Sequence, residues 1–106
     1  MLLSHLGYDD DVKFSAELPW VDIIVGGHSH TQLDGGEMHN GILITQNMKS
    51  IPYATHSTLV LEDHKVVEKK AERIAVAGQP DVNKTVAELL RYFSENPAFK
   101  RALQTV

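Results

Sequence analysis

Two histidines lie one residue apart in residues 26–31 (Gly-Gly-His-Ser-His-Thr), directly after a short apolar run. Imidazole nitrogens bind transition metals, and loops that leave the carboxyl ends of parallel strands are where α/β proteins place their ligand sites. If the loop continues the direction of the strand, side chains alternate, so His28 and His30 would project to the same side. The hydroxyl of Ser29 or Thr31 could hold the loop by a further hydrogen bond. The spacing therefore predicts a metal site at this loop.

A third histidine, His5, stands in a comparable position, just after the apolar pair Leu2-Leu3. Loops at the carboxyl ends of neighbouring parallel strands converge on one crevice, so His5 is expected to join His28 and His30. The chain has no cysteine, which excludes thiolate metal sites and disulfides and leaves His, Asp, Glu and Asn as ligands. The remaining histidines are expected to play no part in the site: His39, His56 and His64.

The elements that would position these histidines can be predicted from the pattern around them. Leu2-Leu3 looks like the end of a strand, and the apolar run 21–25, interrupted only by Asp22, is typical of a parallel strand buried on both faces. Between them, the acidic run 9–11 supplies N-cap and first-turn carboxylates for a helix that extends to about Leu18, before Pro19.

The rest of the chain predicts further strands and then helices. Glycines mark turns at 35–36 and 40–41, residues 42–45 form a compact strand, and segments 53–62 and 65–76 form a hairpin around Asp63-His64. In the last third of the chain the apolar residues recur at helical spacing. This predicts one helix over 81–93 and a second, short helix after Asn96-Pro97. The expected fold class is α/β with C-terminal helices.

Composition narrows the possible partners. A chain of 106 residues with 42% hydrophobic and 23% charged content is ordinary for one soluble domain. The net charge of −4, without a basic cluster, predicts no nucleic acid polymer as partner. No apolar run approaches the roughly 18–20 residues of a membrane span, and the first residues lack the pattern of a signal peptide. The compartment is left open.

Residues 3–7 (Leu-Ser-His-Leu-Gly), followed by 21–31, strongly resemble the back half of a calcineurin-like metallophosphoesterase domain, in its 5′-nucleotidase branch. The resemblance covers about residues 2–75. It implies a two-sheet αββα sandwich, with residues 1–78 as its C-terminal half and 79–106 as a helical segment that leads toward a second domain. It also implies two divalent metals (Mn, Zn, Co, Fe or Mg) that act on a nucleotide or other phosphoester. His5 and His28 would bind one metal and His30 the other.

The chain departs from that family in its ligand set. The family's Asp-x-His, Gly-Asp and Gly-Asn-His motifs are absent from the 106 residues, so no catalytic or substrate-binding residue is assigned and at most a partial metal site is expected. Three imidazoles divided between two metals cannot hold both ions for catalysis. The resemblance therefore implies an incomplete fragment, inactive alone, that self-associates or needs an N-terminal half. The alternatives are a non-catalytic remnant that binds a metal and an interaction module. Members of the family are often periplasmic or extracellular.

Overall fold

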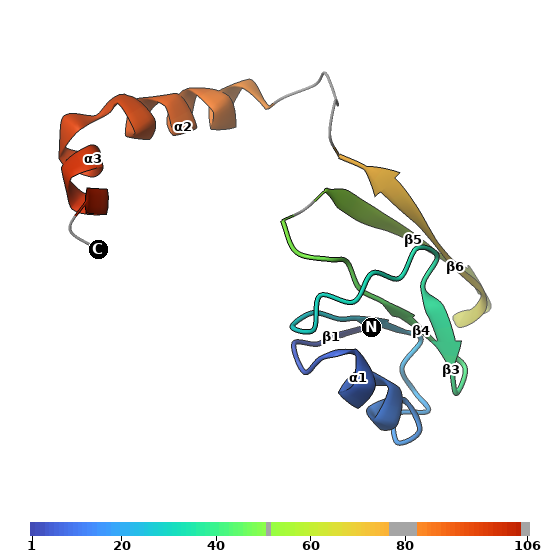
Figure 1. Cartoon of the computed structure of the whole chain (residues 1–106). Coiled ribbons are helices and arrows are strands. Elements are labelled where there is room, and N and C mark those ends of the chain that lie inside the picture. Colours follow the sequence, from blue (N-terminus) through green and yellow to red (C-terminus); the bar gives the residue numbers. More distant parts are fainter. Residues whose placement is uncertain (51, 77–82, 105–106) are drawn as a thin grey trace.

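The computed structural model describes residues 1–50, 52–76 and 83–104. These residues form a mixed α/β structure with two sheets and accompanying helices, which confirms the predicted fold class (Figure 1). In chain order the elements are β1 (Leu2–Leu3), α1 (Tyr8–Ser15), β2 (Ile23–Val25), β3 (Glu37–His39), β4 (Ile42–Thr45), β5 (Tyr53–Glu62), β6 (Lys65–Ala75), α2 (Lys84–Glu95) and α3 (Pro97–Gln104).

The first sheet has the strand order β1-β2-β4-β3, and its first three strands are parallel. The parallel pairing of β1 with β2 was predicted, whereas the direction of β4 was not. Ile24 pairs with Leu2 of β1 on one side and with Ile44 of β4 on the other. Strand β3 is antiparallel to β4, to which it is joined by the tight turn at Asn40 and Gly41, both with positive φ. The continuous apolar runs occupy the centre of the sheet because both of its faces are covered.

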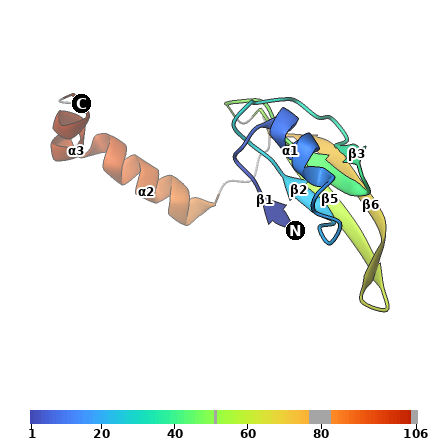
Figure 2. The same ribbon diagram turned by 90° about the horizontal axis from the view of Figure 1, so that it is seen from below.

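The core lies at this central pair of strands. Ile24 and Ile44 are fully buried, and Ile42 and Leu33 pack with them. Val12 of α1 packs against the cluster on one face of the sheet. The hairpin β5–β6 lies over the other face (Figures 1 and 2). The arrangement therefore has three layers, with the parallel sheet in the middle.

The hairpin turns where the sequence predicts it. Asp63 and His64 have φ of 47° and 64°, and two consecutive positive values are typical of the two-residue turns that match the twist of a hairpin. The strand pairing runs from Tyr53 opposite Ala75 to Glu62 opposite Lys65. The second sheet is therefore a two-stranded ribbon built from local contacts.

Charged side chains connect the hairpin to the first sheet. Lys69 donates to the Gly41 carbonyl at 2.6 Å and lies 3.2 Å from the Asp22 carboxylate, and Arg73 pairs with Asp34 at 2.7 Å. None of the residues described in β5 and β6 is buried. Polar contacts therefore help to fix the position of the hairpin on the first sheet, each with the modest contribution typical of exposed ion pairs.

Helices α2 and α3 follow in the last third of the chain, apart from the sheets in both views (Figures 1 and 2). Asn83 caps α2 by accepting from the Val86 amide at 3.0 Å, and Asn96 caps α3 by accepting from the Ala98 amide at 2.9 Å. The first helix was predicted over 81–93; residues 81–82 of that range lie outside the described residues. Of the helices in the described ranges, none is long and apolar enough to cross a membrane.

One local expectation is wrong, and one strand was missed. The helix predicted to begin in the acidic run and to reach Leu18 instead spans Tyr8–Ser15, with Gly7 at its N-cap (φ 106°) and no side chain capping it. Strand β3 was not predicted, because a strand of three residues with one apolar side chain, Met38, is too short to show an alternation.

Candidate metal centre

Two of the three predicted ligands meet at the carboxyl end of the parallel sheet. His5 follows β1 and His28 follows β2, and the centroids of their rings are 5.2 Å apart with the ring planes at 72°. Both side chains are exposed, so their nitrogens are accessible from solvent. Neighbouring parallel strands end at the same edge, which is why residues 23 positions apart come together here.

His30 does not join this pair in a common cluster. Within residues 1–50, 52–76 and 83–104, no group of three or more His, Asp or Glu side chains is arranged to hold one metal ion. The expectation that the loop continues the strand is wrong, because His28 and His30 have φ of 73° and 54°. Left-handed backbone at both positions turns the chain, so the alternation of an extended strand does not apply.

The same two positive φ values mark the loop as conformationally unusual. Residues other than glycine rarely adopt this region, and such residues are concentrated at active sites and ligand-binding loops, where the surrounding structure holds them in place. Two of them within residues 28–30 imply that specific contacts fix the loop.

Two hydrogen bonds that Gln46 accepts supply much of that support. Its Oε1 accepts from the Thr31 amide at 2.6 Å and from the Ser29 hydroxyl at 2.8 Å. Ser29 also accepts from the Tyr8 amide at 3.0 Å, which ties the loop to the start of α1. The Ser29 hydroxyl therefore anchors the loop, as predicted, whereas Thr31 is held to Gln46 through its backbone amide. Their partner, Gln46, was missed because it lies 15 and 17 residues further along the chain.

Gly26 and Gly27 leave room for side chains from neighbouring segments of the chain. A Cβ at Gly27 would stand 3.0 Å from Nδ1 of His5, and a Cβ at Gly26 would stand 2.6 Å from Oδ2 of Asp11. Only glycine allows such close approach at position 26 without a shift of its neighbours. The Gly-Gly sequence therefore lets the segment that carries His5 pack directly against the segment that carries His28.

Asp11 has a different role from the helix capping expected of it. Its side chain is buried, and its Oδ1 accepts a short hydrogen bond from the hydroxyl of Ser4, the residue before His5. The sequence could not distinguish it from Asp9 and Asp10, which are exposed.

A second polar cluster lies at the start of α1, against β3. The hydroxyl of Tyr8 donates to Glu37, and Nε2 of His39 lies 3.2 Å from both groups. The hydrogen bond from Tyr8, with a further contribution from His39, lowers the pKa of Glu37 below its ordinary value. The same bond to Glu37 raises the pKa of the Tyr8 hydroxyl. The cluster therefore favours an ionised carboxylate beside a neutral phenol.

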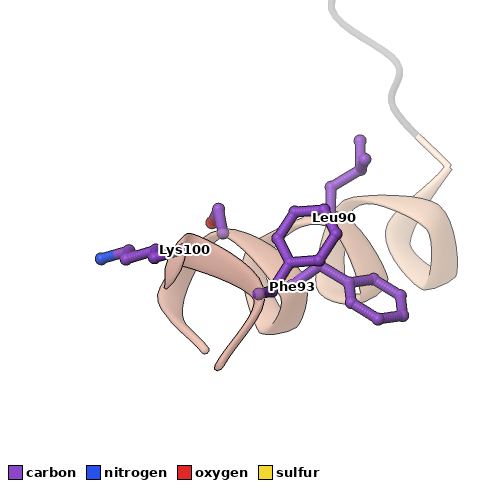
Figure 3. A pocket seen from close by; sticks show the side chains of 5 residues that line it. Leu90, Phe93 and Lys100 are labelled. Carbon is purple, nitrogen blue, oxygen red and sulfur yellow. The ribbon is translucent and has the colours of Figure 1, made fainter. Parts of the chain in front are cut away.

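An apolar hollow lies between α2 and α3 (Figure 3), and no histidine lines it. Leu90, Phe93 and Phe99 line it together with Ser94 and Lys100. Ligand sites need polar groups that fix the orientation of what they bind, and this hollow offers few. It is not a candidate for the chemistry of the histidines.

Comparisons with known proteins give one partial similarity. The chain is 39% identical over 49 residues to a Bacillus subtilis (strain 168) protein described as the uncharacterized metallophosphoesterase YunD. The match covers 46% of this chain and 11% of that protein. No family model and no solved structure matches. The similarity supports kinship with the metallophosphoesterase superfamily and nothing finer.

Proposed function

We propose that this chain supplies part of the metal centre of a metallophosphoesterase of the 5′-nucleotidase branch, which hydrolyses nucleotide phosphates when the domain is complete. The observation that carries the proposal is the meeting of the His5 and His28 rings at the carboxyl edge of the parallel sheet. The partial similarity to a metallophosphoesterase supports the reaction class. The branch rests on the sequence motifs around His5, His28 and His30.

The donor set fits a transition metal. His5 and His28 offer imidazole nitrogens, and the missing side chain at Gly27 leaves Nδ1 of His5 free of steric conflict with the loop. These two residues would hold one ion, and His30 would contribute to a second. Bound divalent ions would polarise the phosphoryl group and activate water.

Two imidazoles leave a metal shell incomplete, because structural and catalytic sites use three or four protein ligands. The missing carboxylate and asparagine ligands must therefore come from another polypeptide segment. We propose that a front half of the domain adds to β1 and supplies these ligands, and that without it a second copy of this chain covers the same edge without completing the metal shell. In support, β1 pairs with β2 on one side, and Leu3 on β1 is 80% exposed, although parallel sheets are normally covered.

Metal titration of purified variants tests the centre. The wild-type chain should bind zinc or manganese with modest affinity, and His28→Ala should abolish binding because it removes one of the paired rings. His30→Ala should have a smaller effect on the affinity for the ion that His5 and His28 would hold. His64→Ala, on the hairpin turn, is the matched control and should bind like the wild type. Identical calorimetric titrations for the wild type and a His28→Ala/His30→Ala variant would refute the proposal.

Phosphatase assays test the reaction. The chain alone should hydrolyse an aryl phosphate or AMP at background rates, even with added manganese, cobalt or zinc. Co-expression with a polypeptide that carries the Asp-x-His, Gly-Asp and Gly-Asn-His segments should restore turnover, because the two chains would complete both metal shells. His28→Ala should abolish the restored activity and His64→Ala should leave it intact. Fast turnover by the lone chain without His28 and His30 would place the chemistry elsewhere.

A further inference from the structure

The hydroxyl of Ser29 has three hydrogen-bond partners, and together they use its full capacity. It accepts from the Tyr8 amide at 3.0 Å, and it lies 2.8 Å from Oε1 of Gln46 and 2.9 Å from the hydroxyl of Thr31. A serine hydroxyl has one proton to donate and two lone pairs with which to accept. Because the Gln46 oxygen can only accept, Ser29 donates its proton there. The hydroxyl of Thr31 must then donate to Ser29.

Ser29 also supplies the cap that α1 lacks. Gly7 stands at the N-cap of this helix and has no side chain, and Tyr8 is the first helical residue. The first four amides of a helix have no partner within the helix. The Ser29 hydroxyl accepts from one of them, although Ser29 lies 21 residues further along the chain. The histidine loop and the start of α1 therefore stabilise one another.

The same hydrogen bond joins the two segments that carry the paired histidines. Tyr8 lies three residues after His5, and Ser29 directly follows His28. The bond therefore fixes the His5 segment to the histidine loop beyond the last paired residues of β1 and β2. Close to this bond, the His5 and His28 rings come within 5.2 Å of one another, measured between their centroids.

The backbone on either side of Ser29 needs support of this kind. His28 and His30 have φ of 73° and 54°, and non-glycine residues keep such values only where the surroundings hold them. Ser29 is the residue between them, and its side chain is bonded to three different partners.

We propose that Ser29 is a positioning residue whose hydroxyl holds the histidine loop in its left-handed conformation and sets the arrangement of His28 against His5. It acts through these ligands and binds neither metal nor substrate. Loss of a group that orients metal ligands typically lowers metal affinity by about 10- to 100-fold. The effect on metal affinity rests on the proposed function, whereas the effect on the loop does not.

Two variants of the same shape test the hydroxyl. Ser29→Thr keeps it, and Ser29→Val replaces it by a methyl group on the same branched side chain. Ser29 is exposed, so the added methyl group can point to solvent. Ser29→Ala removes the hydroxyl without added bulk. Ser94→Ala is the matched control, because it removes an exposed serine hydroxyl that bonds to the Arg91 carbonyl within its own helix.

Two measurements without metal read the loop. Hydrogen exchange of the Tyr8 amide should be about fivefold faster in Ser29→Ala and Ser29→Val, which corresponds to about 1 kcal/mol for the lost hydrogen bond. The strong NOE between amide and Hα protons that marks a positive φ should weaken at His28 and His30 in the same variants. Ser29→Thr and Ser94→Ala should match the wild type in both measurements.

Two measurements with metal read the proposed centre. Calorimetry should show zinc affinity about tenfold weaker in Ser29→Ala and Ser29→Val, with Ser29→Thr within about threefold of the wild type. The visible absorption of bound cobalt(II) depends on the geometry of its ligands. It should change in Ser29→Ala and Ser29→Val and stay as in the wild type in Ser29→Thr.

The proposal is overturned if Tyr8 exchange and the NOEs of the two histidines are the same in Ser29→Val as in Ser29→Thr. It is also overturned if the wild type binds zinc and these two variants bind it equally well. A wild-type chain that binds no zinc would remove the proposed function, and the measurements without metal would still decide the role of Ser29 in the loop. If Ser29→Val fails to fold, Ser29→Ala is compared with Ser29→Thr by the same criteria.

Discussion

Replacing Gly26 by alanine should destabilise the protein by a steric effect that the structure locates. The new Cβ would stand 2.6 Å from Oδ2 of Asp11, 3.2 Å from Nε2 of Gln46 and 3.3 Å from the Thr45 carbonyl oxygen. Since the φ of Gly26 is not in the left-handed region, backbone strain does not add to the cost. Overpacking costs about 1–3 kcal/mol. The reduced entropy of the unfolded chain offsets about 0.4–1 kcal/mol of this. We expect a net loss of about 1–2 kcal/mol in the free energy of unfolding.

Urea denaturation followed by the NMR signals of the Ile24 and Ile44 amides measures this loss at the core. Fluorescence of Trp20 would report poorly on it, because that side chain is 74% exposed. Gly35→Ala is the matched control, since its Cβ would meet the Ala71 carbonyl oxygen at an ordinary 3.6 Å. The control should stay within about 0.5 kcal/mol of the wild type.

Introducing Gly26→Ala into an Asp11→Ser variant tests whether the contact with Asp11 causes the loss of stability. Asp11→Ser shortens the side chain and removes Oδ2, so Gly26→Ala should cost less in that background than in the wild type. Two results would refute the reasoning: a Gly26→Ala variant as stable as Gly35→Ala, or a penalty for Gly26→Ala that is the same with and without Asp11.

Three further predictions concern other parts of the chain. Because the hydrogen bond from Tyr8 lowers the pKa of Glu37, the stability that this carboxylate contributes is present above pH 4.5 and is lost as the pH falls through the lowered value. Tyr8→Phe should raise the Glu37 pKa in an NMR titration, and an unchanged pKa would contradict the assignment. Asn83→Ala removes the cap of α2 and should cost that helix about 1 kcal/mol, visible as a loss of helical Cα chemical shifts in its first turn. Ile44→Val, at a fully buried position, should lower the free energy of unfolding by about 0.5–1.5 kcal/mol in urea.

The parts of the fold that could be predicted are those whose signal is local. The apolar runs at 23–25 and 42–45 form the buried centre of the sheet, since such runs need cover on both faces. The hairpin followed from the two strand-like segments on either side of Asp63-His64. Strand β3 gave no such signal, because it is a polar edge strand that pairs with β4.

The meeting of His5 and His28 could also be predicted, because it depends on strand topology. The hydrogen bonds of Asp11 and Gln46, which hold the segments that carry these histidines, could not be predicted. Asp11 looks like an ordinary first-turn carboxylate until its burial and its bond to Ser4 are known. Gln46 looks like a polar residue after a strand, and its role depends on a loop that lies 15 residues earlier. Such contacts arise from tertiary packing and leave no periodicity in the sequence.

The two sheets differ in the sequence separation of their paired residues, and this has a consequence for the order of folding. Glu62 pairs with Lys65 across a tight turn. In the parallel sheet, by contrast, Leu2 pairs with Ile24 and Ile24 pairs with Ile44, and both pairings join residues that are distant in the sequence. Closing the longer loops costs chain entropy before any contact compensates for it, so local pairs form faster. In a pulse-labelling experiment, the amides of the hairpin should gain protection before those of the parallel sheet. Because His5 reaches His28 when β1 docks on β2, the metal centre is assembled in the slow phase of folding.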